Sequence, residues 1–332
     1  MEQIEQKDLK LIKLRNNNQT EVGILNLGAT LFSIKMDDSS GKRVNVIVSP
    51  KRPEDFLTAS YKDHNKLFGA SIGRFAGRIS KGEFSIGNEK YELPQQNGEH
   101  LHGGAEGFQY KLWHVEEETS GKNPSVTLSY LSNDGEEGYP GNLKVQVNYT
   151  LSEDDKLSIT YTAETDRNTI VNLTNHAYFN LNGEGSVSDH FLFINADKIL
   201  KIDEKNLPTG DLVNLPKNPK NFGSNKLIGN RVLNDAYVLN SDDQEVSARL
   251  FSPMTGIKME MRTNQSAIIA YAPEELPSSL SYQTSISKEY PSICLEAQNF
   301  PDAPHFRNFP SSQLAPGEKY INEISLSFSV KK

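Results

Sequence analysis

Apolar and polar residues alternate along much of this chain, and the alternation constrains the fold more than any other feature of the sequence. Successive side chains of a β-strand point to opposite faces, so a period of two predicts a strand with one buried face. In "LKVQVNYTL" (143–151) that face consists of Leu143, Val145, Val147, Tyr149 and Leu151. After the turn residues "SEDD", the alternation resumes at Leu157, Ile159 and Tyr161. The two segments predict an antiparallel hairpin.

The same pattern recurs between turns rich in Gly, Pro, Asn and Asp. The predicted strand segments are 22–36, 44–49, 125–131, 143–163, 190–202, 247–262 and 321–330. In the last of these, apolar residues from Ile324 to Val330 alternate with serines, which predicts an edge-to-core strand. Helical periodicity is not sustained over three turns anywhere, and "RPEDFLTAS" predicts only a short helical turn after Pro53. The chain is therefore predicted to be all-β.

The length of 332 residues fits two average domains or one large β-domain. No long low-complexity linker separates the predicted strands. The segment 208–230 is rich in Pro, Gly and Asn, and we interpret it as a functional loop in preference to a domain linker. We expect a single domain over 1–332, folded as a large antiparallel β-sandwich.

Composition excludes several classes of function. The net charge is −8 and the lysines and arginines are scattered, so nucleic acid is not an expected partner. The N-terminal segment lacks the pattern of a signal peptide, and no segment approaches 18 consecutive apolar residues, so we expect a cytoplasmic protein with no membrane partner. The only cysteine, Cys294, cannot form an internal disulfide.

The segment "QQNGEHLHGG" (95–104) admits three interpretations. His100, His102 and Glu106 have the H-x-H-x3-E spacing of the metal-binding cupins, but no second half of such a site is evident downstream. The histidines could instead serve catalysis. The third interpretation is a strand end at which Gly103 and Gly104 make the turn.

Two further segments carry candidate catalytic groups. In "NLTNHAYFNL" (172–181), His176 stands among polar and aromatic residues too densely interleaved for an ordinary core. If "SICLEAQ" (292–298) is a strand, Glu296 lies on one face together with Cys294 and Gln298. Burial would raise the pKa of this glutamate towards the range of a general base, although a structural ion pair with an arginine is an equal alternative.

Taken in order, five segments resemble the aldose 1-epimerases, also called galactose mutarotases. The segments are "GRFAGRISKG", "NGEHLHGG", "TNHAYFNL", "NDAYVL" and "CLEAQNFPDAPH". The similarity covers about residues 20 to 330. The resemblance implies a galactose mutarotase-like supersandwich with an open cleft, and a reaction that interconverts the α and β anomers of a free aldose. It implies no cofactor and no metal, and a small-molecule sugar, glucose or galactose by default, as the partner.

The resemblance also assigns roles to residues of this chain. Glu296 matches the family's general base and His176 its general acid. His102 and Arg78 match groups that bind the sugar near its ring oxygen, and Asp235 matches a carboxylate that grips sugar hydroxyls. The sugar's C–H faces are expected to stack on a ring, for which Tyr178 and Phe300 are the candidates. His100 receives no role.

The chain departs from the family's pattern at two places. Gly77 stands where members often have asparagine, and "IAYAPEELP" (269–277) replaces the usual "YTG" segment. Both departures concern specificity. An epimerase acting on a disaccharide is therefore one alternative, and the others are an epimerase acting on a phosphorylated hexose and a non-catalytic carbohydrate-binding module on the same fold. Monomer and homodimer both stay open.

Overall fold

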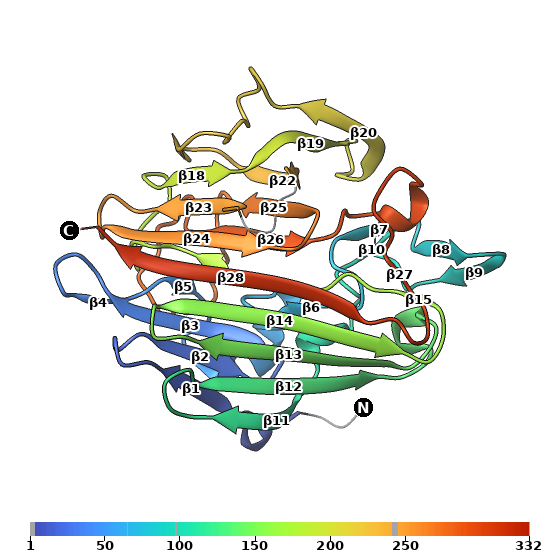
Figure 1. The fold of residues 1–332 in the computed structure, drawn as a ribbon, viewed down its shortest axis with the longest axis horizontal. Coiled ribbons are helices and arrows are strands. Elements are labelled where there is room, and N and C mark those ends of the chain that lie inside the picture. The colour runs from blue at the N-terminus through green and yellow to red at the C-terminus, as the bar shows by residue number, and fades with distance from the viewer. Residues whose placement is uncertain (1–3, 65, 97, 241–244, 332) are drawn as a thin grey trace.

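The computed structural model describes residues 4–64, 66–96, 98–240 and 245–331, and its architecture is a stack of antiparallel β-sheets (Figure 1). In the described residues the largest sheets have nine, seven and four strands. The prediction of an all-β antiparallel sandwich is confirmed. No helix in the described ranges has the length and apolar character needed to cross a membrane.

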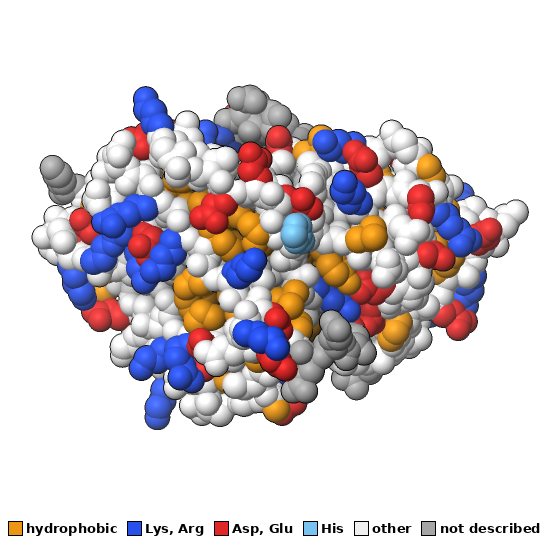
Figure 2. Space-filling model, turned by 90° about the horizontal axis from the view of Figure 1, so that it is seen from below, with side chains coloured by type: hydrophobic (Ala, Val, Ile, Leu, Met, Phe, Trp, Pro, Cys, Tyr) orange, Lys and Arg blue, Asp and Glu red, His pale blue; other side chains and the backbone are white. Residues whose placement is uncertain are grey.

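The strands of the nine-stranded sheet lie one above another in Figure 1, from β11 at the bottom of the view to β18 in its upper part. Its strands, in spatial order, are β11 (His114–Thr119), β12 (Ser125–Ser132), β13 (Leu143–Leu151), β14 (Lys156–Thr165), β28 (Tyr320–Val330), β24 (Ile257–Thr263), β23 (Ala248–Phe251), β18 (Phe191–Ile194) and β21 (Lys226–Leu227). The predicted hairpin is confirmed, because β13 and β14 pair from Leu151 opposite Leu157 onwards. Figure 2 shows acidic and basic side chains interspersed on one face of the molecule.

The seven-stranded sheet packs against this layer. Its strands, in spatial order, are β20 (Pro208–Asn214), β19 (Ala196–Ile202), β22 (Leu233–Leu239), β25 (Ala267–Ala272), β26 (Ile293–Gln298), β17 (Tyr178–Phe179) and β5 (Ile47–Val48). The four-stranded sheet consists of β1 (Leu11–Arg15), β2 (Glu21–Leu25), β3 (Thr30–Asp37) and β4 (Arg43–Asn45).

Short elements connect the sheets. The two-stranded pairs are β7 (Arg78–Ser80) with β10 (Glu99–Leu101), β8 (Glu83–Ile86) with β9 (Glu89–Glu92), β15 (Thr169–Ile170) with β27 (Gln313–Leu314), and β6 (Ser71–Ile72) with β16 (Thr174–Asn175). The helices are α1 (Ala59–His64) and the 3₁₀ turns η1 (Gln6–Asp8), η2 (Pro53–Leu57), η3 (Phe108–Tyr110), η4 (Glu136–Gly138) and η5 (Ala303–His305). The helical turn predicted after Pro53 is confirmed by η2 and α1.

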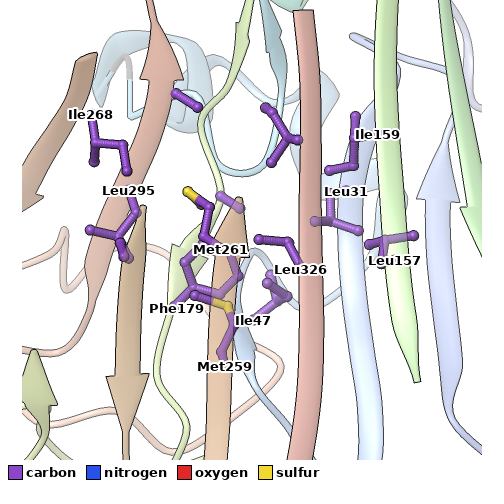
Figure 3. Close-up of a cluster of buried hydrophobic side chains, with 14 of the residues drawn as sticks. Leu31, Ile47, Leu157, Ile159, Phe179, Met259, Met261, Ile268, Leu295 and Leu326 are labelled. Atoms are coloured by element: carbon purple, nitrogen blue, oxygen red, sulfur yellow. The ribbon is translucent and has the colours of Figure 1, made fainter. Parts of the chain in front are cut away.

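The main hydrophobic core lies between the sheets and contains residues from Ile12 to Phe328. Figure 3 shows Met259, Met261 and Leu326 of the nine-stranded sheet and Ile268 and Leu295 of the seven-stranded sheet in one cluster of buried side chains. Each fully buried side chain of this size contributes about 1.5–3 kcal/mol relative to exposure. The inner face of the seven-stranded sheet is therefore held by the core, and the side chains of its outer face do not belong to this core.

The structure differs from the sequence analysis in the position of one strand and in the content of two segments. The C-terminal strand β28 lies inside the nine-stranded sheet, between β14 and β24, and not at an edge. The run 190–202 contains two strands, β18 and β19, which lie in different sheets. The segment 208–230 is not simply a loop, because it contains β20 and β21.

Candidate active site

A cleft of about 200 Å³ opens on the outer face of the seven-stranded sheet. Its floor is a row of side chains from three neighbouring strands, in which Ala236 pairs with Ile269 and Ile269 with Glu296. The N-terminal half of the chain contributes Lys66, Leu67, Gly77, Arg78, Leu101 and His102. Segments far apart in the sequence therefore meet at this cleft.

Glu296 lies on the cleft face of β26, as the alternation predicts. Leu295 and Ala297 point into the main core, whereas Glu296 and Gln298 line the cleft. The Glu296 side chain is 3% exposed, and its Oε2 atom has no hydrogen-bond partner in the described structure. Burial raises the pKa of Glu296 to about 8, while the charge of Arg78 acts in the opposite direction.

His176 lies between β16 and β17 and faces Glu296 across the cleft. Its Nε2 atom is 3.5 Å from Glu296 Oε1. The ring stacks on Tyr178, with 5.1 Å between the ring centroids, and its Nδ1 atom is 3.6 Å from Cys294 Sγ. Burial lowers the pKa of His176 to about 4, so the imidazole is neutral at pH 7.

Tyr178 lines the cleft, but its hydroxyl is engaged. The hydroxyl donates to the carbonyl of Lys66 at 2.7 Å. Its ring supports the imidazole of His176. Phe300, the other ring considered for stacking on the sugar, does not line the cleft and packs edge-on against Phe309. The prediction that Phe300 is a stacking surface for the sugar was therefore wrong.

His102 and Gly77 hold each other in place at the rim. The Gly77 N–H donates to His102 Nδ1 at 3.2 Å, and the His102 N–H donates to the Gly77 carbonyl at 3.0 Å. Because Nδ1 is an acceptor, Nε2 carries the proton of the neutral ring. Burial lowers the pKa of His102 well below its usual range, with a further contribution from the charge of His176. His102 can therefore donate one hydrogen bond to a bound oxygen.

Arg78 lines the cleft and is anchored by one end of its guanidinium. Its Nε atom lies 2.8 Å from Glu99 Oε1. Among the described residues no partner is found for the other guanidinium donors, so they can bind a ligand oxygen in an orientation that the ion pair restricts.

The pair of histidines does not form a metal centre with Glu106. His100 is buried in β10, where its Nδ1 lies 2.8 Å from the carbonyl of Pro94, and Glu106 is exposed. His102 follows the strand with φ 51°, so the chain has already turned. Within the described ranges no three His, Cys, Asp or Glu side chains are grouped as metal ligands. His100 therefore lies at a strand end, as the third interpretation predicts, whereas His102 lines the cleft.

Asp235 is not where the resemblance places it. Asn234 and Ala236 line the cleft, so Asp235, between them on β22, points to the opposite face of the sheet. There its Oδ1 atom accepts a hydrogen bond from Lys220 Nζ at 2.7 Å. The prediction that Asp235 binds sugar hydroxyls was therefore wrong, because the residue that faces the cleft is its neighbour in the strand. That residue is Asn234, whose polar side chain can contact a ligand.

Sequence reasoning also missed Tyr271 and Lys66, and it placed Gln298 on the face of Glu296 without a role; all three residues line the cleft. Tyr271 lies in the segment that replaces "YTG", and its ring meets that of His176 edge-on at 6.3 Å. The alternation of "AIIAYA" could have identified this strand and placed Tyr271 on the same face as Ile269. No local pattern marks Lys66.

Comparisons with known proteins agree on one family. A family model described as aldose 1-epimerase matches residues 10–327. The chain is 34% identical to galactose mutarotase of Sus scrofa, covering 95% of this chain and 92% of the relative, and 33% identical to aldose 1-epimerase of Escherichia coli K12, covering 96% and 95%. Among solved structures, the GalM/aldose epimerase homologue from C. elegans aligns with a TM-score of 0.89 at 27% identity, covering 98% of this chain and 100% of that one. The galactose 1-epimerase from Lactobacillus acidophilus NCFM aligns with a TM-score of 0.85 at 30% identity, covering 99% and 98%.

Proposed function

The chain belongs to the aldose 1-epimerase family of isomerases, and we propose that it interconverts the α and β anomers of a free aldose such as glucose or galactose by general acid and base catalysis. The observation that carries the proposal is the approach of Glu296 Oε1 to His176 Nε2, 3.5 Å apart in a cleft. One carboxyl group and one imidazole facing the same space can act on both oxygens of a hemiacetal.

Each ring opening transfers two protons, and after reclosure the enzyme has the protonation state with which it began. In ring opening, the Glu296 carboxylate takes the proton of the anomeric hydroxyl while imidazolium His176 gives its Nε2 proton to the ring oxygen. The C1–O5 bond breaks, the carbonyl forms at C1, and the pair is left as carboxylic acid and neutral imidazole. Rotation about C1–C2 exposes the other carbonyl face, and reclosure reverses both transfers. Positioned acid–base groups of this kind each contribute about 10²–10⁴-fold.

The pKa shifts in the cleft support this proton count. Burial raises the pKa of Glu296 to about 8 and lowers that of His176 to about 4. Between these values the pair holds one exchangeable proton, as carboxylic acid with neutral imidazole. Carboxylate with imidazolium has the same number of protons. The form that opens the ring and the form that closes it are therefore tautomers with the same total charge.

The other side chains of the cleft orient the sugar in this proposal. His102 donates from Nε2, Arg78 donates from its free guanidinium end, and Asn234 offers an amide to the hydroxyls. Tyr271 supplies an apolar ring face, and Tyr178 supports His176. Orientation of this kind contributes to the rate by holding the reacting atoms in place.

We also propose that the chain acts as one domain, since the core cluster runs from Ile12 to Phe328 and the cleft takes residues from both halves of the chain. The expected ligand is a small uncharged sugar. Lys66 and Arg78 both line the cleft, so a phosphorylated hexose belongs in the substrate panel as the alternative.

Polarimetry tests the proposal directly. Freshly dissolved α-D-glucose, α-D-galactose, lactose, maltose and glucose 6-phosphate are followed with and without purified protein. Faster mutarotation of a free aldose is expected, and Glu296→Gln should reduce it by at least about 100-fold. Absence of acceleration with every sugar would refute the proposal, and calorimetric binding without turnover would indicate a binding module.

Two neighbouring substitutions test which residue of β22 contacts the sugar. Asn234→Ala should raise the Michaelis constant about threefold to tenfold, the effect of losing one hydrogen bond. Asp235→Asn is the matched control, because its side chain lies on the other face; it should leave the Michaelis constant unchanged even if the protein loses stability. The opposite pattern would return the binding role to Asp235.

A further inference from the structure

The sulfur of Cys294 lies against the ring nitrogen of His176 that faces away from Glu296. Cys294 is two residues before Glu296 on β26 and is fully buried. Its Sγ atom is 3.6 Å from His176 Nδ1, within hydrogen-bond range for sulfur. The imidazole therefore has the carboxyl group at one nitrogen and the thiol at the other.

We propose that Cys294 is a positioning residue for the reaction proposed above: its sulfur accepts the Nδ1–H hydrogen bond of His176 and leaves Nε2 as the nitrogen that releases and recovers the proton. The inference rests on the proposed function for its catalytic meaning. The contact itself is a property of the resting protein and can be tested without substrate.

The proton count fixes the direction of the hydrogen bond. When imidazolium gives its Nε2 proton to the ring oxygen, the neutral ring keeps its remaining proton on Nδ1. That N–H needs an acceptor in a buried place, since an unpaired buried donor costs about 1–3 kcal/mol. The carbonyl oxygen of His176 is a second acceptor of the ring, and it also accepts the Gly69 N–H at 2.9 Å. Cys294 Sγ fills the need.

A thiol differs from the partners that other histidines of this chain have. Nδ1 of buried His190 lies 2.9 Å from the carboxylate of Asp189, while its Nε2 accepts the Leu181 N–H at 3.0 Å. His305 likewise meets Asp302, at 2.6 Å. A carboxylate at Nδ1 stabilises the imidazolium and would oppose release of the proton. A neutral thiol fixes the tautomer without holding the proton back.

The surroundings keep Cys294 in its neutral form. Burial raises the pKa of the Cys294 thiol well above its usual range, and the charge of Glu296 acts in the same direction. The charge of Lys66 acts in the opposite direction on the thiol and lowers the pKa of His176. Tyr178, Tyr271 and His102 contribute ring contacts to the imidazole.

Nitrogen-15 NMR of histidine-labelled protein at pH 7 tests the tautomer. We expect His176, assigned by loss of its signals in His176→Gln, to be neutral with its proton on Nδ1. Cys294→Ala should move the population towards the Nε2–H form, and Cys294→Ser, which keeps an acceptor, should restore the wild-type tautomer. Protonated Nε2 in the wild type, or an unchanged tautomer in Cys294→Ala, would overturn the proposal, and the first of these results needs no folded Cys294 variant.

Kinetics provide the second readout. Cys294→Ala should lower kcat about threefold to tenfold with little change in KM, the effect of one lost hydrogen bond, and Cys294→Ser should recover most of the rate. Ser292→Ala is the matched control, because Ser292 is a buried polar residue two positions earlier without a hydrogen bond from its hydroxyl in the described structure. It should keep the wild-type rate. Equal losses in the alanine and serine variants of Cys294 would contradict the positioning role.

The two proposals fail separately. If no sugar is anomerised, the proposed function fails while the tautomer measurement still reports on the contact. If mutarotation is fast and the tautomer is Nε2–H, only the role of Cys294 is refuted.

Discussion

The Glu296→Gln variant should be more stable than the wild type at alkaline pH, although we expect it to lose most of its activity. Burial raises the pKa of Glu296 to about 8 from an ordinary value of 4.5. The folded protein therefore binds one more proton than the unfolded chain between these values, and the free energy of unfolding falls as pH rises through that range. Glutamine is neutral at every pH and does not incur this loss.

The magnitude follows from the two pKa values. At about 1.36 kcal/mol for each pH unit, the interval from 4.5 to about 8 amounts to about 5 kcal/mol. His176 acts with the opposite sign: burial lowers its pKa to about 4 from 6.5, so stability rises between these values as the unfolded histidine loses its proton. The histidine contribution is present in both proteins and cancels in the difference between them.

Urea denaturation at pH 5 and at pH 9, followed by tryptophan fluorescence, measures the difference. The variant should match the wild type within about 1 kcal/mol at pH 5 and exceed it by about 3–5 kcal/mol at pH 9. Exposed Glu117 offers the matched control, since Glu117→Gln should show no such trend. A stability difference that does not grow with pH would refute the assignment of a buried, protonated carboxyl group.

Three further predictions concern the same cleft. The pH dependence of kcat/KM should be bell-shaped with limbs near 4 and 8, because the Glu296–His176 pair lacks its base below this range and its acid above it; a rate that still rises at pH 9 would contradict this. Gly103→Ala should lower the free energy of unfolding by more than about 2 kcal/mol in urea titrations, since a Cβ atom there would overlap the Gly73 carbonyl oxygen and φ is 80°; wild-type stability would contradict the geometry of the turn. Tyr271→Ala should raise KM about threefold to tenfold in polarimetry while Tyr271→Phe stays near wild type, and equal effects would indicate that the hydroxyl is what binds.

The periodic parts of the fold could be predicted from the sequence, and the short parts could not. The strands β13 and β14 are nine and ten residues long and bury one face each, so their alternation is unambiguous. The strands β7 and β10 have three residues each and carry Arg78 and His100, and three residues do not establish a period. The positions of β7 and β10 depend on the pairing of segments that are distant in the sequence, so a local pattern cannot predict them.

The candidate site shows the same division. The alternation of "ICLEAQ" alone predicts Glu296 and Cys294 on one face of a strand, and in β26 both side chains approach the ring of His176. In "NDAYVL" the motif is recognisable but its register is not, because both Asn234 and Asp235 are polar and either could face the cleft. Only the pairing of β22 with β25 decides between them.

The opposite pKa shifts of Glu296 and His176 have one cause, and that cause connects stability with activity. Burial disfavours charge, so it makes the carboxyl group a weaker acid and the imidazole a weaker base until one proton is held by the pair from about pH 4 to about pH 8. In water the same two groups would both be charged between about pH 4.3 and 6.5, and the pair would carry no shared proton above that range. The cleft thus extends the singly protonated state through neutral pH by removing water, and the protein loses stability at alkaline pH as a result. A variant that opens the cleft to solvent should therefore gain alkaline stability and narrow the pH range of activity together, because both follow from the same desolvation.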